Sequence, residues 1–489
     1  MSTERKSSHV PLERVDACRW RIPKSYKPGM RVDGLIFADD VLIESIRQDN
    51  SLVQVANVAT LPGIVGWSLA MPDIHWGYGF CIGGVAATDP AEGGVISPGG
   101  VGYDINCGVR LVRSDLTRAD VEPRINELVN TLFDHVPTGV GRGGKVKFGP
   151  GELRSLLAKG SRFVVESGYG WPEDLEVTEA SGALLDARPE YVSETALKRG
   201  HDQCGTLGSG NHFMEVQVVD EIVDAEAAAA FGLELGQITV MIHSGSRGLG
   251  YQVCEDNLKS LRNVPAKHGI ELPDRQLVCA PVNSEEGRHY LGAMQAAANF
   301  AWANRQIMTH LARECFKRVF GRTAQRLGMH MVYDVAHNIT KLEHYEVDGR
   351  RRLLCVHRKG ATRAFPAGHP EVPERYRAVG QPVLVPGDMG RSSWVLVGNQ
   401  AAMEQSFGST CHGAGRVMSR SEAIRRAKGR SIARELLARG VVAKARDRTG
   451  LDEEQPEAYK DVSVVADVVH KAGLARKVAH LRPLGVIKG

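Results

Sequence analysis

The chain contains 489 residues, 43% of them apolar and 24% charged, and 54 are glycine. No stretch has the uninterrupted apolar length of a membrane span and residues 1–14 are polar, so we expect a soluble cytoplasmic protein rather than a membrane or secreted one. The net charge of +4 is too small to indicate nucleic-acid binding by itself, and nine cysteines without any Cys-x-x-Cys pair argue against a disulfide framework or a zinc ribbon.

The first half of the chain predicts short elements separated by many turns. Residues 1–60 read as a mixed N-terminal segment, and residues 61–115 combine dense glycine with short β-like runs. Residues 123–199 have a helical, charged pattern. A glycine-rich segment at 139–151 interrupts this pattern and is predicted to be a loop.

The second half contains the strongest helical signal. Helical spacing over 284–322 predicts one or two long helices, and β-like runs at 238–242 and 329–335 flank it. Strands and helices in irregular order favour an α+β fold, with a complicated α/β layering as the alternative. We predict a single large complex domain over 1–489, with mixed β-sheets, surrounding helices and the 1–60 segment packed on it.

Two motif-like segments lack the chemistry that they suggest. Residues 139–145 have the spacing of a phosphate-binding P-loop, but Val146 stands where the Mg²⁺-binding hydroxyl is required. Arg31-Val-Asp-Gly34 is similar to the Lys-x-Asp-Gly of ligases that carry a nucleotide on lysine, but arginine is not deprotonated in proteins. If this chain activates a nucleotide covalently, another residue is the nucleophile.

The segment Gly99-Gly-Val-Gly-Tyr-Asp104-Ile-Asn-Cys107-Gly places a carboxylate and a thiol three residues apart. On a strand these side chains would point to opposite faces, so a shared site requires a turn or a helical bend, which the glycines favour. The alternative is that Cys107 is a small buried apolar residue and Asp104 a turn residue.

Three histidines share one local pattern, in which a β-like or glycine-rich run precedes the imidazole and polar or turn residues follow it. They are His212, His243 and His337. Each alone can be a core histidine, but with Asp104 and Cys107 they supply three imidazoles, a carboxylate and a thiolate. A thiolate can bridge two metal ions, and paired metals suit phosphoryl chemistry because both the attacking and the leaving oxygen are neutralised. Ligand softness favours Zn²⁺ over Mn²⁺, but residue chemistry leaves the ion open.

The segment Cys411-His412-Gly413-Ala414-Gly415-Arg416 sets an imidazole beside small residues that allow backbone N–H groups to approach a phosphate. Ser419-x-x-Glu422 follows it as a capping box that predicts a helix start, and helix N-termini favour anions. Neutral imidazole is abundant near pH 7 and is a competent nucleophile toward phosphorus. His412 is therefore a candidate nucleophile; the alternative is a loop histidine that caps a carbonyl group.

Other segments are candidates for contact with a nucleotide or with RNA. Residues 386–393 are rich in turn formers and either wrap a nucleotide or form a plain connection. Lys488, at the end of the chain, is a solvated charge unless the tail is tied into a site. Basic runs at 416–430 and 357–360 either track RNA phosphates or form solvated faces. No aromatic residues interleave with them, so base stacking is not indicated.

From about Gly63 to Gly489 the sequence closely resembles the RtcB RNA ligases, in specific blocks that occur in the same order. The blocks are Met71–Gly79, Gly99–Gly108, Gly210–Glu215, His243–Gly248, Ala336–Asn338, His357–Gly360, His412–Gly415 and Lys488–Gly489. The family has a compact, complex α+β domain of its own type, which agrees with the irregular order of elements.

The resemblance implies a GTP- and Mn²⁺-dependent RNA ligase of tRNA splicing or RNA repair. Such an enzyme joins RNA 3′-phosphate or 2′,3′-cyclic phosphate ends to 5′-hydroxyl ends through a histidine–GMP intermediate and guanylylation of the RNA 3′ end. The implied cofactors are two Mn²⁺ ions per chain and GTP. The implied partners are RNA with such ends, as in tRNA halves or cleaved RNA, and an archease-like activator, with the chain itself a monomer.

The resemblance also implies roles for particular residues. Cys107 would bridge two Mn²⁺ ions, with Asp104, His212, His243 and His337 completing their shells, and His412 would carry GMP. The guanylate would be surrounded by Asn211, His212, Phe213, Met214, Glu215, His337, Asn338, Pro386, Gly387, Asp388, Met389, Ser393, His412, Gly413, Ala414, Gly415 and Lys488. Arg416 and Arg420 are candidates for RNA phosphate contact.

Asp388 departs from the family pattern, in which this position is often serine. A carboxylate beside a phosphate repels it unless a metal or an arginine, such as Arg391, compensates.

Two other functions use the same residues: a dinuclear metallophosphodiesterase that needs no nucleotide, and an RNA-binding subunit with structural metals. The small-residue loop at His412 and the Lys488 tail favour the ligase over both.

Overall fold

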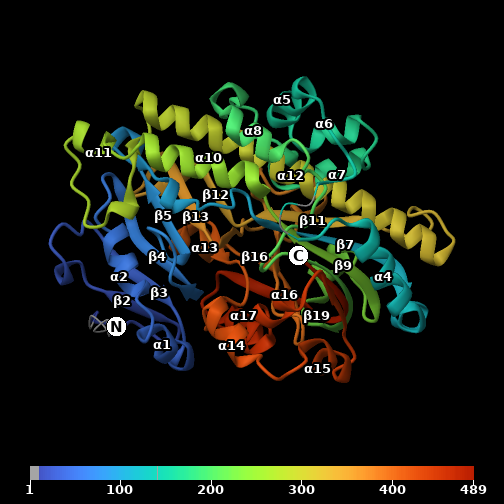
Figure 1. The fold of residues 1–489 in the computed structure, drawn as a ribbon. Coiled ribbons are helices and arrows are strands. Elements are labelled where there is room, and N and C mark those ends of the chain that lie inside the picture. Colours follow the sequence, from blue (N-terminus) through green and yellow to red (C-terminus); the bar gives the residue numbers. More distant parts are fainter. Residues whose placement is uncertain (1–9, 140, 142) are drawn as a thin grey trace.

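Two large mixed β-sheets organise the molecule, seen in a computed structural model that describes residues 10–139, 141 and 143–489 (Figure 1). Residues 1–9 of the predicted N-terminal segment, and Val140 and Arg142 of the glycine-rich segment, lie outside the described residues. The strands and helices alternate irregularly along the chain, which confirms the predicted α+β fold.

The seven-stranded sheet has the order β1-β2-β3-β4-β5-β13-β12, with β3 and β4 parallel and the other neighbours antiparallel. Its N-terminal strands therefore extend the same sheet as β4 and β5. The strands are β1 (Glu13–Arg14), β2 (Arg19–Ile22), β3 (Asp33–Phe37), β4 (Ile64–His75), β5 (Ile82–Thr88), β12 (Asn338–Val347) and β13 (Arg350–Lys359).

The eight-stranded sheet has the order β11-β7-β9-β8-β19-β16-β15, and β18 pairs with β19 in parallel. Its strands are β7 (Gly108–Thr117), β8 (Phe213–Ile222), β9 (Gln237–Ser244), β11 (Met331–Ala336), β15 (Pro382–Val385), β16 (Ser393–Gly398), β18 (Val442–Ala445) and β19 (Ala475–Lys488). Two short pairs complete the strands: β6 (Val95–Ile96) with β10 (Ala280–Pro281), and β14 (Ala361–Arg363) with β17 (Ser409–Cys411).

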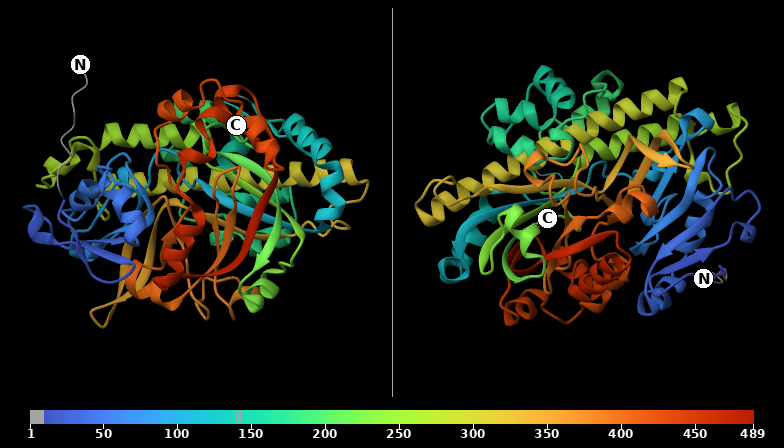
Figure 2. Two further views of the ribbon diagram at one scale, coloured as in Figure 1. Left: turned by 90° about the horizontal axis from the view of Figure 1, so that it is seen from below. Right: turned by 180° about the vertical axis from the view of Figure 1, so that it is seen from behind.

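The region predicted to hold one or two long helices forms a single helix, α12 (Glu285–Phe320). The Ser284 side chain caps its first turn by accepting from the Gly287 N–H, and Gly321, at φ 67°, ends it in the left-handed conformation that glycine adopts without strain. The helix α10 (Arg247–Ser260) packs beside α12 (Figures 1 and 2). No helix among the described residues combines the length and the apolarity needed to cross a membrane, although α12 is long enough.

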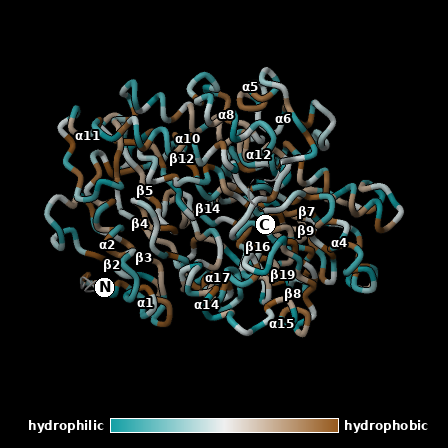
Figure 3. Tube along the Cα trace, in the orientation of Figure 1, coloured by the Kyte–Doolittle hydropathy of each residue, from teal (hydrophilic) through white to brown (hydrophobic). Residues whose placement is uncertain are grey.

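The remaining helices surround the sheets. They are α1 (Asp40–Arg47), α2 (Ser51–Val58), α3 (Arg118–Val121), α4 (Ile125–His135), α5 (Pro150–Lys159), α6 (Ser161–Glu166), α7 (Pro172–Glu176), α8 (Glu194–Gly200), α9 (Ala225–Phe231), α11 (Val264–Lys267), α13 (Gln400–Ser406), α14 (Arg420–Arg426), α15 (Ile432–Ala438), α16 (Arg448–Glu453) and α17 (Val462–Lys471). Short 3₁₀ helices are η1 (Lys24–Tyr26), η2 (Pro90–Glu92), η3 (Pro98–Gly100), η4 (Glu122–Arg124), η5 (Glu179–Gly182), η6 (Pro189–Tyr191), η7 (Arg275–Leu277), η8 (Glu374–Tyr376) and η9 (Pro456–Ala458). Hydrophobic and hydrophilic segments are interspersed along the trace (Figure 3), as expected when several core clusters share these elements.

Candidate active site

Strand register in the eight-stranded sheet brings distant parts of the sequence to one edge. Lys488 of β19 pairs with Phe213 of β8, and Phe213 pairs in turn with His243 of β9. His243 lies opposite Val109 of β7, two residues after Cys107, and β11 ends beside the start of β7 just before His337. The C-terminal tail and four of the predicted ligand segments therefore meet at this edge, near the middle of the molecule in Figure 1.

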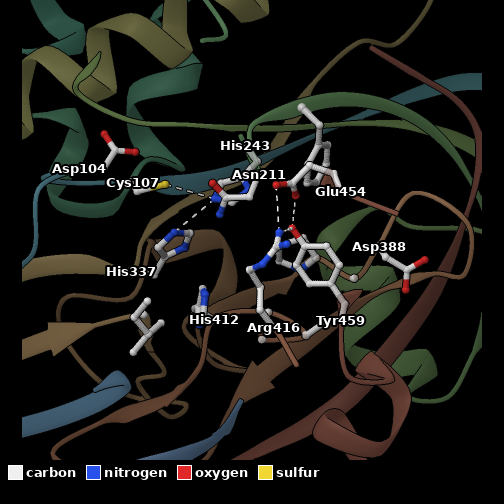
Figure 4. A pocket seen from close by; sticks show the side chains of 18 of the residues that line it. Asp104, Cys107, Asn211, His243, His337, Asp388, His412, Arg416, Glu454 and Tyr459 are labelled. Carbon is white, nitrogen blue, oxygen red and sulfur yellow. Dashed lines mark hydrogen bonds and ion pairs between the residues drawn. The ribbon is translucent and has the colours of Figure 1, made fainter. Parts of the chain in front are cut away.

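The five predicted metal ligands form one cluster. The Cys107 Sγ lies 3.2 Å from His243 Nε2 and 3.4 Å from His212 Nε2. His243 Nε2 lies 3.3 Å from His337 Nε2, and His212 Nε2 lies 2.9 Å from Asp104 Oδ2. These atoms define two groups suited to a metal ion, Cys107 with His243 and His337, and Asp104 with Cys107 and His212. Cys107 belongs to both groups, as a bridging thiolate requires, and its side chain points toward His243 and His337 in Figure 4.

Two imidazoles of the cluster are suited to bind a cation as they stand, whereas the thiol must first lose its proton. Burial raises the pKa of Cys107 well above its usual range, and Asp104 adds to this rise. Burial also holds the pKa values of His243 and His337 well below the usual range, and the buried Nδ1 of His337 has no hydrogen-bond partner among the described residues. Neutral imidazoles offer lone pairs, and a metal ion would displace the thiol proton. The donor set therefore fits one or two cations.

A buried arginine of α12 fixes the backbone around this cluster. Arg305 donates to the carbonyl oxygens of Asn106 (2.7 Å) and Ser244 (2.8 Å), and to the Asn106 side chain (2.9 Å). Its other two hydrogen bonds go to Asp334 of β11, both at 2.8 Å. Asn106 has a φ of 50°, so the turn between Asp104 and Cys107 is the bend that sequence analysis required. Arg305 thus ties this turn to the strand ends that carry His243 and His337.

His412 lies next to the cluster and is held by a carboxylate that sequence analysis did not assign. The Asp73 Oδ2 accepts from the backbone N–H groups of His412 (2.9 Å) and Gly413 (3.2 Å), and lies 2.5 Å from His412 Nδ1. Burial alone would raise the pKa of Asp73, but the contact with His412 lowers it. The His412 and His337 ring centroids are 4.9 Å apart (Figure 4). With Nδ1 facing Asp73, Nε2 is the ring nitrogen left for the cavity.

The sequence around Asp73 gives only a weak indication that this residue belongs to the site. It is a lone carboxylate in an otherwise apolar run, Leu69–Ile74 of β4, and it is fully buried. Its partner His412 is 339 residues away, so no local pattern predicts the contact. The small residues after His412 also have a packing role, because a Cβ at Gly415 would lie 2.2 Å from the Asp73 carbonyl oxygen.

A cavity of about 330 Å³ lies beside the cluster and His412. Most of the residues predicted for metal, guanylate or RNA contact line it, namely Asp104, Cys107, Asn211, Phe213, Glu215, His243, His337, Asn338, Pro386, Gly387, Asp388, Met389, His412, Gly413, Ala414, Gly415, Arg416, Arg420 and Lys488. Other lining residues were not assigned from the sequence, among them His75, Tyr78, Tyr103, Lys359, Glu454 and Tyr459.

Three residues predicted for metal or guanylate contact do not line the cavity. His212 lies behind its wall, in contact with Cys107 and Asp104. Met214 follows Phe213 on β8, so its side chain points to the opposite face and packs in the core with Val216 and Ile242. Ser393 lies behind Gly387, and its hydroxyl accepts from the Gly387 N–H at 3.2 Å. The structure therefore does not bring the Met214 side chain to the cavity.

Asp388 is compensated by the arginine that sequence analysis named. Arg391 Nε donates to Asp388 Oδ2 at 2.5 Å, and the Gly390 N–H donates to the other carboxylate oxygen at 3.0 Å. Burial raises the pKa of Asp388, although Arg391 opposes the rise. The carboxylate points away from His337 and His412 in Figure 4, so it is not directed at the cluster.

The two predicted RNA-contact arginines occupy different environments. Arg416 lies inside the cavity, where it donates to Glu454 Oε1 and to the Tyr459 hydroxyl, both at 3.0 Å (Figure 4). Lys488 Nζ lies 3.7 Å from the other oxygen of Glu454, and Arg420 Nε lies 3.8 Å from Oε1, so three cations share this carboxylate. Arg420 begins α14, where its side chain is exposed at the rim.

The basic runs offer less positive surface than the sequence suggested. Arg425 and Arg426 both pair with Glu422, and Arg430 pairs with Glu435. The interpretation of residues 357–360 as a surface for RNA, or as a solvated face, is wrong. Arg358 is fully buried on Glu343, and Lys359 is buried and donates to backbone carbonyl groups.

Glu215 makes the stability of the chain depend on pH. Burial raises its pKa to about 8, although Gln217 and Lys488 oppose the rise, against 4.5 for an ordinary glutamate. The folded chain therefore binds this proton more tightly than the unfolded chain does. As pH rises from the ordinary pKa of 4.5 to the folded-state pKa of about 8, Glu215 alone should lower the free energy of unfolding by about 1.4 kcal/mol per pH unit.

A Glu215→Gln variant should lack this dependence because glutamine stays neutral. Urea denaturation of both proteins across that pH window should show the variant gaining stability relative to the wild type as pH rises. A difference between the two proteins that does not change with pH would contradict the prediction.

Comparison with known proteins gives a consistent result over nearly the whole chain. A family model described as tRNA-splicing ligase RtcB matches residues 54–489. The chain is 56% identical over 480 residues to the tRNA-splicing ligase RtcB of Thermococcus kodakarensis, covering 98% of this chain and 99% of the relative. It is 55% identical over 478 residues to that of Archaeoglobus fulgidus, with the same coverage of both chains. The protein of the same name from Nanoarchaeum equitans is 48% identical over 481 residues, 98% of this chain and 100% of the relative.

Proposed function

The chain belongs to the RtcB family of tRNA-splicing ligases, and we propose that it joins an RNA 3′-phosphate or 2′,3′-cyclic phosphate to a 5′-hydroxyl at the expense of GTP. One observation carries this proposal: an imidazole held by a buried carboxylate faces two metal-ligand groups that share one thiol, at the same cavity. A metallophosphodiesterase would use the same ligand groups, but it would form no protein–GMP adduct and need no GTP.

The residues of the cluster would hold two Mn²⁺ ions, with Cys107 common to both sites. Asp104 and His212 would complete one set of ligands, and His243 and His337 the other. When bound, the ions would neutralise phosphate oxygens and so lower the barrier to attack on phosphorus. Arg416 and Lys488 add positive charge on the opposing wall, where a polyphosphate can be placed.

His412 would act as the nucleophile in the first of three steps. Its Nε2 lone pair attacks the α-phosphorus of GTP, a P–N bond forms and pyrophosphate leaves. The ring becomes cationic, and the Asp73 carboxylate beside Nδ1 balances this charge. A cyclic phosphate end would first be hydrolysed by water to a 3′-phosphate with a free 2′-hydroxyl. An oxygen of the RNA 3′-phosphate then attacks the same phosphorus, which returns His412 to its neutral form. Finally the 5′-hydroxyl loses its proton, attacks the RNA phosphate and displaces GMP.

Labelled GTP tests this proposal directly. Incubation with Mn²⁺ and GTP labelled at the α-phosphate, followed by denaturation, should leave label on the protein, whereas γ-labelled GTP should leave none. Prior removal of metal with a chelator should abolish the labelling, and RNA with a 3′-phosphate should remove the label from the protein. RNA cleavage without GTP, and no adduct, would instead identify a metallophosphodiesterase.

A further inference from the structure

Three tyrosines from distant parts of the sequence form a ladder that leads from the cavity to the surface. The Tyr78 and Tyr103 rings meet edge to face with centroids 5.6 Å apart, and Tyr103 stacks on Tyr251 at 4.8 Å with 24° between the planes. Tyr78 and Tyr103 line the cavity, whereas Tyr251 is 46% exposed. We call these three side chains the tyrosine ladder.

The ladder is anchored to the metal-ligand cluster. Tyr103 directly precedes Asp104 in the chain. Tyr251 lies in the first turns of α10, and the Ser246 N–H just before this helix donates to Asp104 Oδ1 at 3.0 Å. Tyr78 comes from the loop between β4 and β5. The ladder therefore has a fixed position relative to the residues that would bind the reacting phosphate.

The outer end of the ladder carries positive charge. The Arg199 guanidinium, from the neighbouring helix α8, lies over the Tyr251 ring at 5.9 Å from its centroid, and its side chain is exposed. Within residues 10–489, apart from the two gaps, no hydrogen bond holds any of the three phenol hydroxyls. Aromatic faces beside a cation, continuous with a phosphate-binding cavity, are the combination that binds single-stranded nucleic acid without reading its sequence.

From this geometry, and resting on the proposed function, we propose that the tyrosine ladder is a stacking platform for a nucleobase of the single-stranded RNA end that enters the cavity. Tyr251, with the exposed Arg199 guanidinium over its ring, provides the outer end of the platform, and Tyr103 places the stack beside the metal-ligand cluster. Each base has a π-face, so this platform should accept any sequence.

The test compares RNA binding by three variants. Tyr251→Ala should weaken the binding of a short single-stranded RNA about tenfold, and Tyr251→Phe should bind as the wild type does, because phenylalanine keeps the ring. Tyr191→Ala is a matched control: Tyr191 is also exposed and stacks on His289 at 4.4 Å and 25°, but it does not line the cavity. This control should retain wild-type affinity, as measured by fluorescence anisotropy.

Two RNAs, one ending in a 3′-phosphate and one in a 5′-hydroxyl, show which strand lies on the ladder. Only the RNA that stacks on Tyr251 should bind more weakly to Tyr251→Ala than to the wild type. Replacing the stacked base with an abasic nucleotide should weaken binding to the wild type but not further to Tyr251→Ala. The proposal is overturned if Tyr251→Ala binds both RNAs as the wild type does, or if Tyr251→Phe loses as much affinity as Tyr251→Ala. Protein labelling by GTP is measured on the same samples. If the wild type is labelled and Tyr251→Ala keeps the RNA affinity of the wild type, the ladder proposal alone is overturned. If the wild type is not labelled, the proposed function is overturned.

Discussion

His412→Ala should abolish the transfer of α-phosphate label from GTP to the protein while the metal-ligand cluster still binds Mn²⁺. Alanine removes the only atom proposed to form the P–N bond, and His412 is not among the residues that would hold the metals. Loss of a covalent nucleophile lowers the rate by many orders of magnitude, so no label should be detectable. Metal content of the variant, measured after gel filtration, should match the wild type.

A bypass experiment makes this prediction specific. RNA that already carries GMP on its 3′-phosphate should still be joined to a 5′-hydroxyl RNA by His412→Ala, since the proposed last step does not use His412. Asp73→Asn should keep the nucleophile but slow labelling by about 100-fold or more, because an amide neither orients nor stabilises the cationic ring in the same way. Label on the protein in His412→Ala would exclude His412 as the nucleophile even if ligation itself were normal.

Sequence patterns correctly predicted the helices and the turn whose formation depends on neighbouring residues. The helical spacing over 284–322 predicted α12 because its ends have ordinary caps and its apolar positions repeat at the helical period. Ser419 caps α14 by accepting from the Glu422 N–H, as the capping box predicted. The turn between Asp104 and Cys107 followed from the requirement that a carboxylate and a thiol share a site.

The parts of the site that sequence analysis missed depend on long-range packing. Asp73 and His412 meet across two sheets, and a lone aspartate in an apolar strand does not reveal its partner. The charged run at 357–360 suggested a surface, but β13 is an interior strand whose Arg358 is neutralised by Glu343 on the adjacent β12. The tyrosine ladder could not be predicted from the sequence, because its rings at positions 78, 103 and 251 are far apart in the chain and lie outside the basic runs.

Arg305→Met should destabilise the fold and weaken metal binding together. The substitution leaves the buried carbonyl groups of Asn106 and Ser244 without a donor, and removes one of the two arginines that neutralise Asp334, the other being Arg110. Breaking a buried charge network by removing one partner costs about 3–5 kcal/mol of unfolding free energy. Urea denaturation of the metal-free protein should show this loss.

A second arginine of α12 separates the structural effect from the effect on the site. Arg313 is also buried and paired, with both its Nη atoms 2.7 Å from Asp174, but it does not contact the turn at Asn106. Arg313→Met should therefore lose comparable stability and keep its affinity for metal, measured with Co²⁺ by the absorption of its thiolate complex. Arg305→Met should lose both, because the turn that carries Asp104 and Cys107 is no longer tied to the strand ends of His243 and His337. Equal metal affinity in the two variants would mean that Arg305 supports the fold without positioning the ligands.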